Sequence, residues 1–416
     1  MKNIYITLTL IFLSFFQFSS AQETLSLGAG YANESFYSLA NGEVKSEPYD
    51  NWDLSFQISG FAAAIRVNTA KGLTLKKVPN ADAAAWATLD TAGYDSWSFL
   101  YDSDESWDRG AFNLGIEPGN DFDLGWGVYN PVTHHVNGDS LYLLAFADGS
   151  VKKLKINSLI SGVYSFTHAN LDGSSEITSS LTKSEFSGKF FGYYSFAGDS
   201  TLDREPAATD YDLRFTKYFG LLAPGTYYPV TGVLSNAGVE VAELRQVDVN
   251  AVGIADTAGL TFSSSISTIG YDWKAFSMST FTWVLDDSLT YFVKALDGEI
   301  YKLTFTGFGG TATGNIEFTK TNLTTAVDPQ KDIFMSLNIF PNPAKDKFTL
   351  LFELKNNDLL NISLTDLSGK ILLETQPQSY YGLQQLEFNT PQLAAGLYLL
   401  RLESNGNSTT RKLIIR

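Results

Sequence analysis

Residues 141–156 read LYLLAFADGSVKKLKI, and this stretch decides how the chain folds. Two runs of strand-forming residues flank Asp148-Gly149, a dipeptide that favours the tight turn of a β-hairpin. The same pattern returns around Asp297-Gly298, between YFVKAL and EIYKL. Both stretches predict antiparallel hairpins, so we expect a chain dominated by β-strands.

Other matches accompany the two hairpins in the same order along the chain. Constant order with varying spacing predicts two tandem copies of one β-rich fold, at residues 22–180 and 181–325, with loops of different length. The further pairs are Phe36–Gly42 with Tyr193–Gly198, Trp52–Phe56 with Tyr211–Phe215, and Thr91–Trp97 with Thr268–Trp273.

The composition supports this class and excludes others. The 416 residues include 34 Gly, 21 Tyr and 30 Phe, a mixture that favours strands and turns over helices. The formal net charge of −16 argues against binding to nucleic acid or to anionic membranes. Because the chain has no Cys and three His, it cannot form disulfides, thiolate metal sites or most multi-histidine metal sites.

The N-terminus reads MKNIYITLTLIFLSFFQFSSAQ and has the layout of a secretory signal peptide. Lys2 precedes the apolar run Ile4–Phe18, and small residues follow at Ser19-Ser20-Ala21. The run is shorter than the roughly 20 residues that span a bilayer. We therefore expect residues 1–21 to be removed and the mature chain to have no membrane span.

The last part of the chain predicts a separate small β-sandwich at residues 337–416, after a linker at 326–336. Short apolar or alternating runs are separated by turn residues such as Asn356-Asn357 and Ser368-Gly369. The expected strands are Phe348–Leu354, Asn361–Asp366, Lys370–Glu374, Leu386–Asn389 and Gly396–Glu403.

This C-terminal part resembles the type A sorting domain of proteins exported by the type IX secretion system. The resemblance implies an outer-membrane export machinery and a surface sortase as partners, and a secreted or cell-surface protein of a Gram-negative bacterium. It rests on four motifs, whose defining residues are Pro341, Asn342 and Pro343, then Asp366, Gly369 and Lys370, then Gly396 and Tyr398, and finally Lys412 and Arg416.

The two copies resemble the HmuY-like family of exported haem-binding proteins. In the first copy the resemblance rests on Trp52-Asp53-Leu54-x-Phe56, on Asn68, and on Asp148-Gly149 leading to Lys153–Ile156. The second copy has the corresponding Tyr211–Phe215, Asn236 and Asp297-Gly298. The resemblance implies an all-β protein with two HmuY-like domains before the sorting domain, but such motifs transfer a fold better than a ligand.

The three histidines are the candidate haem ligands, and all lie in the first copy. A pocket there could place His168 opposite His134 or His135, with one imidazole on each side of the iron. Neighbouring residues in a strand point to opposite sides, so only one of His134 and His135 can face the ligand. The alternative is surface or hydrogen-bonded histidine. No cofactor is required, and haem is the one that the histidines suggest.

An acidic loop offers the candidate metal site. Asp102, Asp104 and Asp108 alternate with other residues, as oxygen ligands do in calcium loops. The alternatives are a solvated acidic loop or the paired carboxylates of a glycoside hydrolase.

Four tryptophans between residues 80 and 127 suggest a stacking face for sugars, or a slot for a porphyrin, with packing inside the fold as the alternative. They are Trp86, Trp97, Trp107 and Trp126. We therefore expect an exported, non-enzymatic ligand-binding protein, with haem as the leading ligand. A surface adhesin or glycan-binding protein is the alternative, and a hydrolase is third. Histidines that lie close together across an apolar cavity favour haem, whereas distant histidines and exposed aromatic rings favour adhesion.

Overall fold

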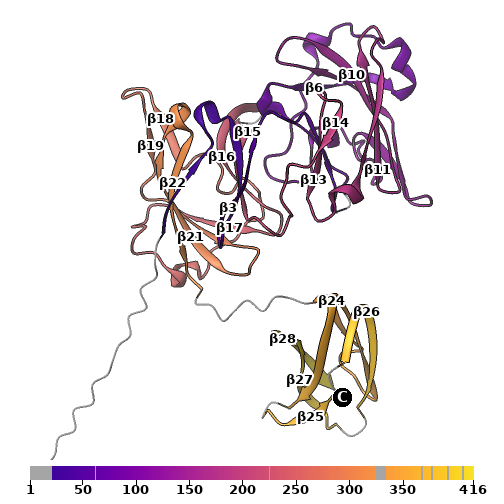
Figure 1. Ribbon diagram of the computed structural model, residues 1–416, viewed down its shortest axis with the longest axis vertical. Coiled ribbons are helices and arrows are strands. Elements are labelled where there is room, and N and C mark those ends of the chain that lie inside the picture. The colour runs from indigo at the N-terminus through magenta and orange to yellow at the C-terminus, as the bar shows by residue number, and fades with distance from the viewer. Residues whose placement is uncertain are drawn as a thin grey trace, which may run out of the picture. The chain divides into compact units, whose positions relative to one another are not determined.

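The computed structural model describes residues 21–60, 62–223, 225–324, 334–366, 369–375, 378–390, 393–404 and 407–416. They form two compact units, divided between Thr325 and Ala326 and described separately below as unit 1 and unit 2. Both consist mainly of antiparallel sheets, which confirms the predicted β-rich class (Figure 1). Most of the predicted signal peptide (residues 1–21) and most of the predicted linker (residues 326–336) lie outside the described residues.

The first half of unit 1 contains a seven-stranded and a four-stranded sheet. The predicted hairpin is present, with Lys152 opposite Leu144 and with Gly149 at a φ of 86°, the left-handed conformation that such a turn needs. The larger sheet holds β6 (Thr74–Asp82), β7 (Gly127–Asn130), β8 (His135–Gly138), β9 (Ser140–Ala145), β10 (Val151–Ile160), β11 (Val163–Asn170) and β12 (Ile177–Thr182). The smaller holds β4 (Leu54–Gln57), β5 (Ile65–Val67), β13 (Phe191–Ser195) and β14 (Ser200–Leu202).

The second half of unit 1 contains a five-stranded sheet, a four-stranded sheet and a separate hairpin. The five-stranded sheet holds β1 (Ala21–Ser26), β17 (Glu240–Leu244), β20 (Thr290–Lys294), β21 (Ile300–Phe308) and β22 (Asn315–Asn322). The four-stranded sheet holds β2 (Asn33–Ser38), β3 (Gly42–Pro48), β15 (Leu213–Ala223) and β16 (Thr226–Ser235), and the hairpin is β18 (Lys274–Ser277) with β19 (Thr282–Leu285).

Helical segments in unit 1 are short, with three to six residues each, and connect strands. They are η1 (Ala29–Tyr31), η2 (Thr69–Lys71), η3 (Ala83–Thr88), η4 (Tyr94–Ser96), η5 (Ala111–Asn113), η6 (Lys183–Phe186), η7 (Ile254–Thr257) and α1 (Gly310–Thr313). No helix in the described ranges is long and apolar enough to cross a membrane.

Strand pairing crosses the position where the sequence copies meet. β2, from the N-terminal part of the chain, pairs with β15, while β13, from after residue 181, pairs with β4. β1 likewise pairs with β22 along its whole length. Each half therefore contains strands from both sequence copies, and the two copies cannot separate without the loss of sheet hydrogen bonds.

The two halves repeat a hydrogen-bonded frame around a buried aspartate. Asp53 accepts from the Phe196 amide at 2.7 Å, and Asp212 accepts from the Leu39 amide at 2.7 Å. In each case the amide belongs to the segment after an exchanged strand. These carboxylates therefore fix β13 and β2 to the half in which each is a guest.

A buried asparagine completes the frame in each half. The Asn68 side-chain amide donates to the backbone oxygens of Tyr49 and Trp52, at 2.7 and 3.1 Å. Asn236 does the same for Ala208 and Tyr211, at 2.7 and 2.8 Å. The sequence match between residues 52–56 and 211–215 thus corresponds to matched bonds.

The structure pairs Trp273 with a different tryptophan of the first half from the one that the sequence match suggested. Trp273 is buried, and its backbone oxygen accepts from the Asp286 amide at 3.0 Å. Its counterpart in the first half is Trp126, which is buried and accepts from the Asp139 amide at 3.3 Å. Trp97, the partner that the sequence suggested, is only partly buried and packs against Tyr94. The sequence similarity around Tyr94 misled because loop lengths differ between the halves.

Each half has its own apolar core, and a third cluster joins them. We name this third group the interface cluster. Trp107 belongs to a loop of the first half, and its indole N–H donates to the Ser235 backbone oxygen of the second half at 2.8 Å. The buried members of the interface cluster are Trp52, Trp107, Phe191, Tyr193, Leu234 and Ile266.

Unit 2 is a small sandwich-like assembly of antiparallel strands around a core of its own. The separate strands predicted at 348–354 and 361–366 are one long strand, with a register shift between Leu354 and Asp358 where a turn was predicted. The strand continues because pairing with β26 continues on both sides of the shift. The elements are β23 (Phe334–Phe340), β24 (Lys347–Thr365), β25 (Ile371–Glu374), β26 (Gln378–Asn389), β27 (Gly396–Ser404) and β28 (Asn407–Ile415).

Candidate functional site

His168 lies on β11 with its side chain in the interior of the first half. Its exposed fraction is 1%, its ring packs edge-on against Phe196, and its Nε2 is 3.2 Å from Asp199 Oδ1. Burial lowers the pKa of His168 below the usual value, and Asp199 offsets only part of this effect. Among the described residues, Nδ1 is buried without a hydrogen-bond partner.

The other two histidines lie at the β7–β8 hairpin, far from His168. His134 is exposed and bonds to the Tyr129 hydroxyl at 2.7 Å, and His135 begins β8. Along β10, β8 reaches Leu159, whereas His168 pairs with Leu154, five positions away. At about 3.3 Å per residue, the separation is at least about 16 Å. The structure therefore does not bring His134 or His135 to face His168.

The three aspartates of the predicted calcium loop face different partners. Asp102 is partly buried beside Arg66 and accepts from the Ala111 amide at 2.8 Å. Asp104 accepts from the Leu221 amide at 3.0 Å, and Asp108 accepts from the side chain of Gln57. Within the described part of the chain, no three acidic or histidine side chains are grouped to hold a metal ion. Instead, these carboxylates hold the loop at residues 102–108 against both halves by hydrogen bonds.

The four tryptophans singled out from the sequence do not form a common face. Trp126 and Trp107 are buried, one in the core of the first half and one in the interface cluster. Trp86 is partly exposed, but the ammonium groups of Lys153 and Lys155 lie 4.6 and 5.0 Å from its ring centre. Packing thus accounts for Trp107 and Trp126, and two lysines occupy the surroundings of Trp86.

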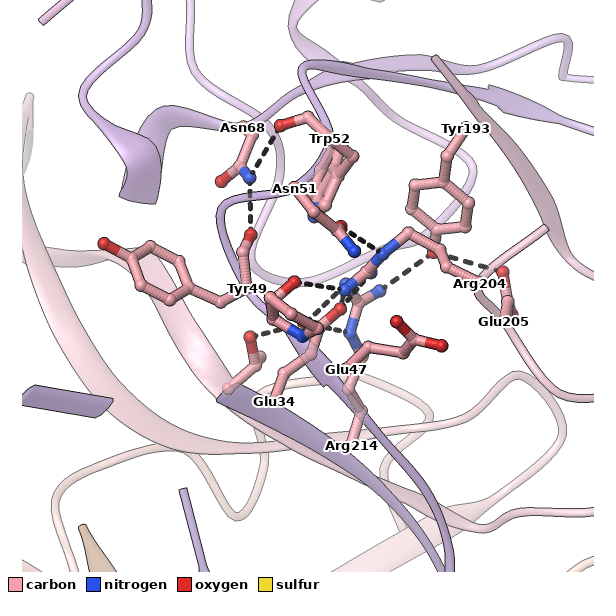
Figure 2. Close-up of polar contacts among 12 residues, drawn as sticks. Glu34, Glu47, Tyr49, Asn51, Trp52, Asn68, Tyr193, Arg204, Glu205 and Arg214 are labelled. Carbon is pink, nitrogen blue, oxygen red and sulfur yellow. Dashed lines mark hydrogen bonds and ion pairs between the residues drawn. The ribbon is translucent and has the colours of Figure 1, made fainter. Parts of the chain in front are cut away.

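A buried ion cluster lies where the two halves meet, and sequence reasoning missed it. Arg204 and Arg214 converge on Glu34 of β2 (Figure 2). Arg214 forms a forked pair with both oxygens of Glu34, at 2.7 and 2.8 Å, and the Thr216 hydroxyl donates to the same carboxylate at 2.8 Å. Burial alone would raise the pKa of Glu34, but the two arginines outweigh burial and lower it. Glu34 therefore remains an anion in the interior.

A second buried carboxylate, that of Glu205, belongs to this cluster, and its pKa is shifted in the opposite direction. Glu205 accepts from the Tyr211 hydroxyl at 2.7 Å and from the Tyr193 hydroxyl at 3.2 Å. Burial raises the pKa of Glu205, and these hydroxyls compensate only in part. Arg204 also reaches the Pro48 backbone oxygen at 2.8 Å. The cluster thus joins two stretches of the chain, residues 34–48 and 193–216, that lie far apart in the sequence.

A small cavity of about 50 Å³ adjoins the ion cluster, lined in part by Arg66, Trp107 and Lys217. The Trp52 indole nitrogen, which also lies on its lining, is buried without a hydrogen-bond partner among the described residues. A cavity of this size has room for a few water molecules and not for a porphyrin. The interior of the interface therefore holds the two halves together and has no room for a ligand as large as a porphyrin.

The β18–β19 hairpin carries a concentration of exposed apolar side chains. Met278 and Phe281 are each 73% exposed at its tip. Trp283 is partly exposed, and its ring is held edge-on between Phe276 at 5.3 Å and Phe308 at 4.9 Å. The Trp283 ring is therefore both accessible and held in one orientation.

Hydroxyl groups alternate with these rings. Ser277 and Ser279 bond to each other at 3.0 Å, and Thr280 and Thr282 bond at 2.7 Å. Of the four residues that carry these hydroxyls, Ser277 is partly exposed and the other three are exposed. The hairpin tip thus combines apolar faces with hydrogen-bonding groups and carries no charged side chain between residues 275 and 285.

Lys274 lies beneath this hairpin, and its ammonium group is buried. It donates to the Thr231 backbone oxygen at 2.6 Å and lies 4.1 Å from the centre of the Trp273 ring. Burial lowers the pKa of Lys274 to about 7, because Asp272 compensates only weakly. The charge under the hairpin therefore changes near neutral pH.

In unit 2, the first and the last of the predicted sorting motifs are joined by hydrogen bonds. The Asn342 side-chain amide donates to the Lys412 backbone oxygen at 2.8 Å, and its oxygen accepts from the Ile414 amide at 2.9 Å. The Arg416 amide donates to the Ala344 backbone oxygen at 2.8 Å. Pro341 and Pro343, on either side of Asn342, each follow a cis peptide bond.

The remaining sorting residues form a turn and a strand start. Lys370 donates from its amide to Asp366 Oδ1 at 3.1 Å, and Gly369 has a φ of 85°. Gly396 begins β27, and the Tyr398 hydroxyl donates to the Ala394 backbone oxygen at 2.7 Å. These positions therefore shape a turn and the start of a strand.

Two solved structures that align with this chain are distantly similar to it. The chain aligns with dimeric latent PorU from Porphyromonas gingivalis at 10% identity and a TM-score of 0.18, over 95% of this chain and 34% of that one. It aligns with a polysaccharide lyase at 10% identity and a TM-score of 0.16, over 88% of this chain and 40% of that one. The chain thus spans about a third of the length of the first and two fifths of the second. No curated protein matches it.

A family match covers unit 2. Residues 338–416 match the family described as the secretion system C-terminal sorting domain. The match begins just before Pro341-Asn342-Pro343 and ends at Arg416, so it includes all the sorting residues predicted from the sequence. Residues 338–416 are therefore a C-terminal sorting domain, and the protein is exported through the type IX secretion system of a Gram-negative bacterium to the cell surface or beyond.

Proposed function

We propose that unit 1 is a binding module that contacts an extracellular glycan through the β18–β19 hairpin. The observation that carries this proposal is the exposure of Met278 and Phe281 beside the partly exposed Trp283. Exposed apolar groups concentrated at one place on a soluble protein mark interaction sites. The export address of unit 2 supplies a setting in which such a surface meets polysaccharide.

The chemistry of the hairpin favours a sugar. The apolar C–H face of a pyranose can stack on an aromatic ring, while its hydroxyls bond to Ser and Thr side chains at the edge. Because Phe276 and Phe308 already hold the Trp283 ring, binding costs little side-chain entropy. A hairpin without charged side chains between residues 275 and 285 suits a neutral glycan better than an ionic one.

The matching hairpin of the first half provides an internal control. β7 and β8 follow Trp126 as β18 and β19 follow Trp273, yet the β7–β8 tip carries Val132, which is 86% exposed, and no Phe, Tyr or Trp between residues 130 and 135. Loss of an apolar side chain at Val132 should therefore leave glycan binding unchanged.

The test is retention of the exported chain on immobilised neutral polysaccharides such as mannan, xyloglucan and chitin. We expect saturable binding to at least one of them, a loss of tenfold or more in Phe281→Ser and Trp283→Ala, and unchanged binding in Val132→Ser. Phe281→Ser removes a ring that is mostly in solvent, so it remains informative if Trp283→Ala disturbs the hairpin. Absence of binding to every glycan, or equal binding by all variants, would refute the proposal.

Haem capture and the HmuY-like relationship stay predictions from the sequence. The distance between the histidine positions and the small interface cavity do not favour a two-histidine haem site. A haem titration followed by absorbance spectroscopy gives the direct check, and a saturable Soret band that is lost in His168→Ala would replace the glycan proposal by haem binding. The hydrolase also stays a prediction.

A further inference from the structure

A pocket of about 380 Å³ lies on the junction of the two halves, away from the aromatic hairpin tip. A loop of the first half supplies Asp104 and Glu105, and the second half supplies the rest of the lining. Two bonds lock the loop in place. The Ile266 amide donates to the Glu105 backbone oxygen at 3.1 Å, and the Leu221 amide donates to Asp104 at 3.0 Å. The pocket is therefore a fixed feature of the joint.

The lining is strongly acidic. Its charged members are Asp104, Glu105, Glu243 and Asp272, and it includes no Lys or Arg. Arg245, outside the lining, pairs with Glu243 and Asp272 and neutralises part of this charge. The Glu105 carboxylate has no hydrogen bond or ion pair within the described ranges. Negative charge thus remains at the pocket, on the first-half side.

An unpartnered hydroxyl at the pocket gives an independent indication of a ligand. The Tyr218 hydroxyl oxygen is buried and, among the described residues, has no hydrogen-bond partner. It lies beside Gly270 of the lining, where a Cβ would be 3.7 Å from it. Burial raises the pKa of Tyr218, and the nearby charges of Asp104 and Asp272 add to this effect. Leaving such a group unsatisfied costs free energy, which a ligand with hydrogen-bond donors would recover.

The arrangement discriminates between kinds of cation. A metal ion needs several oxygens around one point, and the described residues contain no such group of three. The carboxylates here surround a volume instead of a point. An organic cation, with several N–H donors spread over a larger body, can reach carboxylates and the Tyr218 oxygen together.

We propose that this junction pocket binds an organic ammonium or guanidinium group, supplied by a small amine or by a basic peptide side chain. Glu105 provides unneutralised charge, Tyr218 accepts an N–H, and the ring of Tyr271 lines the wall. The pocket lining includes none of the exposed side chains of the β18–β19 hairpin, so this proposal does not depend on the proposed glycan binding.

The test is calorimetric titration of the exported chain, residues 22–416, with trilysine and with spermidine, and with triglycine as the uncharged control. We expect one saturable site per chain for at least one cationic probe. Glu105→Gln and Tyr218→Phe should each weaken it on the order of fivefold. Preference for trilysine would identify a peptide side chain as the natural ligand, and preference for spermidine a free amine.

Controls separate this pocket from diffuse attraction to an acidic protein. Glu117→Gln removes the same charge from an exposed loop outside the pocket and should change nothing, and Tyr218→Phe alters no charge at all. Circular dichroism establishes that each variant is folded. Equal affinities for all variants, no saturation, or one-to-one calcium binding weakened by the same substitutions would overturn the proposal.

Discussion

The two halves of unit 1 share a frame but differ in the hairpin that follows their buried tryptophan. Both fix a guest strand with an aspartate and a preceding loop with an asparagine. The β7–β8 tip of the first half carries Val132 and His134, whereas the β18–β19 tip of the second carries Met278 and Phe281. The difference indicates that the frame maintains the fold, while the hairpins are free to serve binding.

The contrast extends to the residue after each tryptophan. The first half has Gly127, where a Cβ would lie 2.4 Å from the Asn137 backbone oxygen, so a side chain has no room. The second half has Lys274 at this place, with its ammonium group against the Trp273 ring and bonded to the backbone oxygens of Thr231 and Tyr271. Lys274 therefore places against the second hairpin a titratable side chain that Gly127 does not supply in the first half.

The largest effect is expected from breaking the joint between the halves. Glu34→Ala leaves Arg204 and Arg214 buried without their anion, which should lower the free energy of unfolding by about 3–5 kcal/mol. Chemical denaturation of the exported chain measures this change.

The control for this variant is Glu47→Ala, because Glu47 forms its ion pair with Lys45 near the surface at 2.9 Å. Its loss should cost no more than about 1 kcal/mol. Similar losses for the two variants would show that the joint is not held by its ion cluster.

The next prediction sharpens the equivalence of the two frames. Asp53→Ala and Asp212→Ala each remove the acceptor of a buried backbone N–H, and each should destabilise unit 1 by about 1–3 kcal/mol. Paired urea unfolding curves give the comparison. If one variant were neutral and the other costly, the two frames would not be equivalent in energy.

A third prediction uses Lys274, which the first half lacks. Its pKa in the folded protein is lowered to about 7, so above that pH the unfolded chain binds more protons than the folded one. The stability contributed by this group therefore grows as the pH rises from about 7 towards the unfolded pKa of about 10.4, and is lost as the pH falls through 7.

Lys274→Met isolates this contribution. Between pH 7 and pH 8, the wild type should gain about 1 kcal/mol relative to the variant, as measured by urea unfolding at both pH values. A parallel pH dependence of the two proteins would mean that Lys274 stays charged at neutral pH.

The smallest effect on stability is expected at the aromatic tip itself. Phe281→Ser and Val132→Ser both change side chains that are mostly in solvent, so each should alter the free energy of unfolding by less than about 0.5 kcal/mol. Thermal unfolding checks both. A marked loss in Phe281→Ser would indicate that the ring supports the hairpin instead of a ligand.

Part of this architecture was predictable because it depends on local patterns. Asp148-Gly149 and Asp297-Gly298 specify tight turns between strand-forming runs, and both hairpins are present. The sorting domain was predictable because its motifs lie in a fixed order over a short stretch. Asn342 shows why the first and last motifs occur together, since its side chain bonds to the final strand.

Other features required the pairing of distant segments. Nothing local distinguishes Trp97 from Trp126, and only the contacts around Asp139 and Asp286 show that Trp126 matches Trp273. The aromatic hairpin was missed because exposure cannot be inferred from a short apolar run. The histidines drew attention because they are rare, but rarity does not bring side chains together.

Local patterns specify the β-rich class, the repeated motifs and the export address, because turns, alternation and short ordered motifs act over a few residues. The exchange of β2 and β13 between the halves, and the meeting of Glu34 with Arg204 and Arg214, are visible only in the folded chain. The same holds for the pocket at the junction of the two halves. The physical reason is that strand pairing and ion pairing depend on distance in space, which the folded chain sets independently of distance along the sequence.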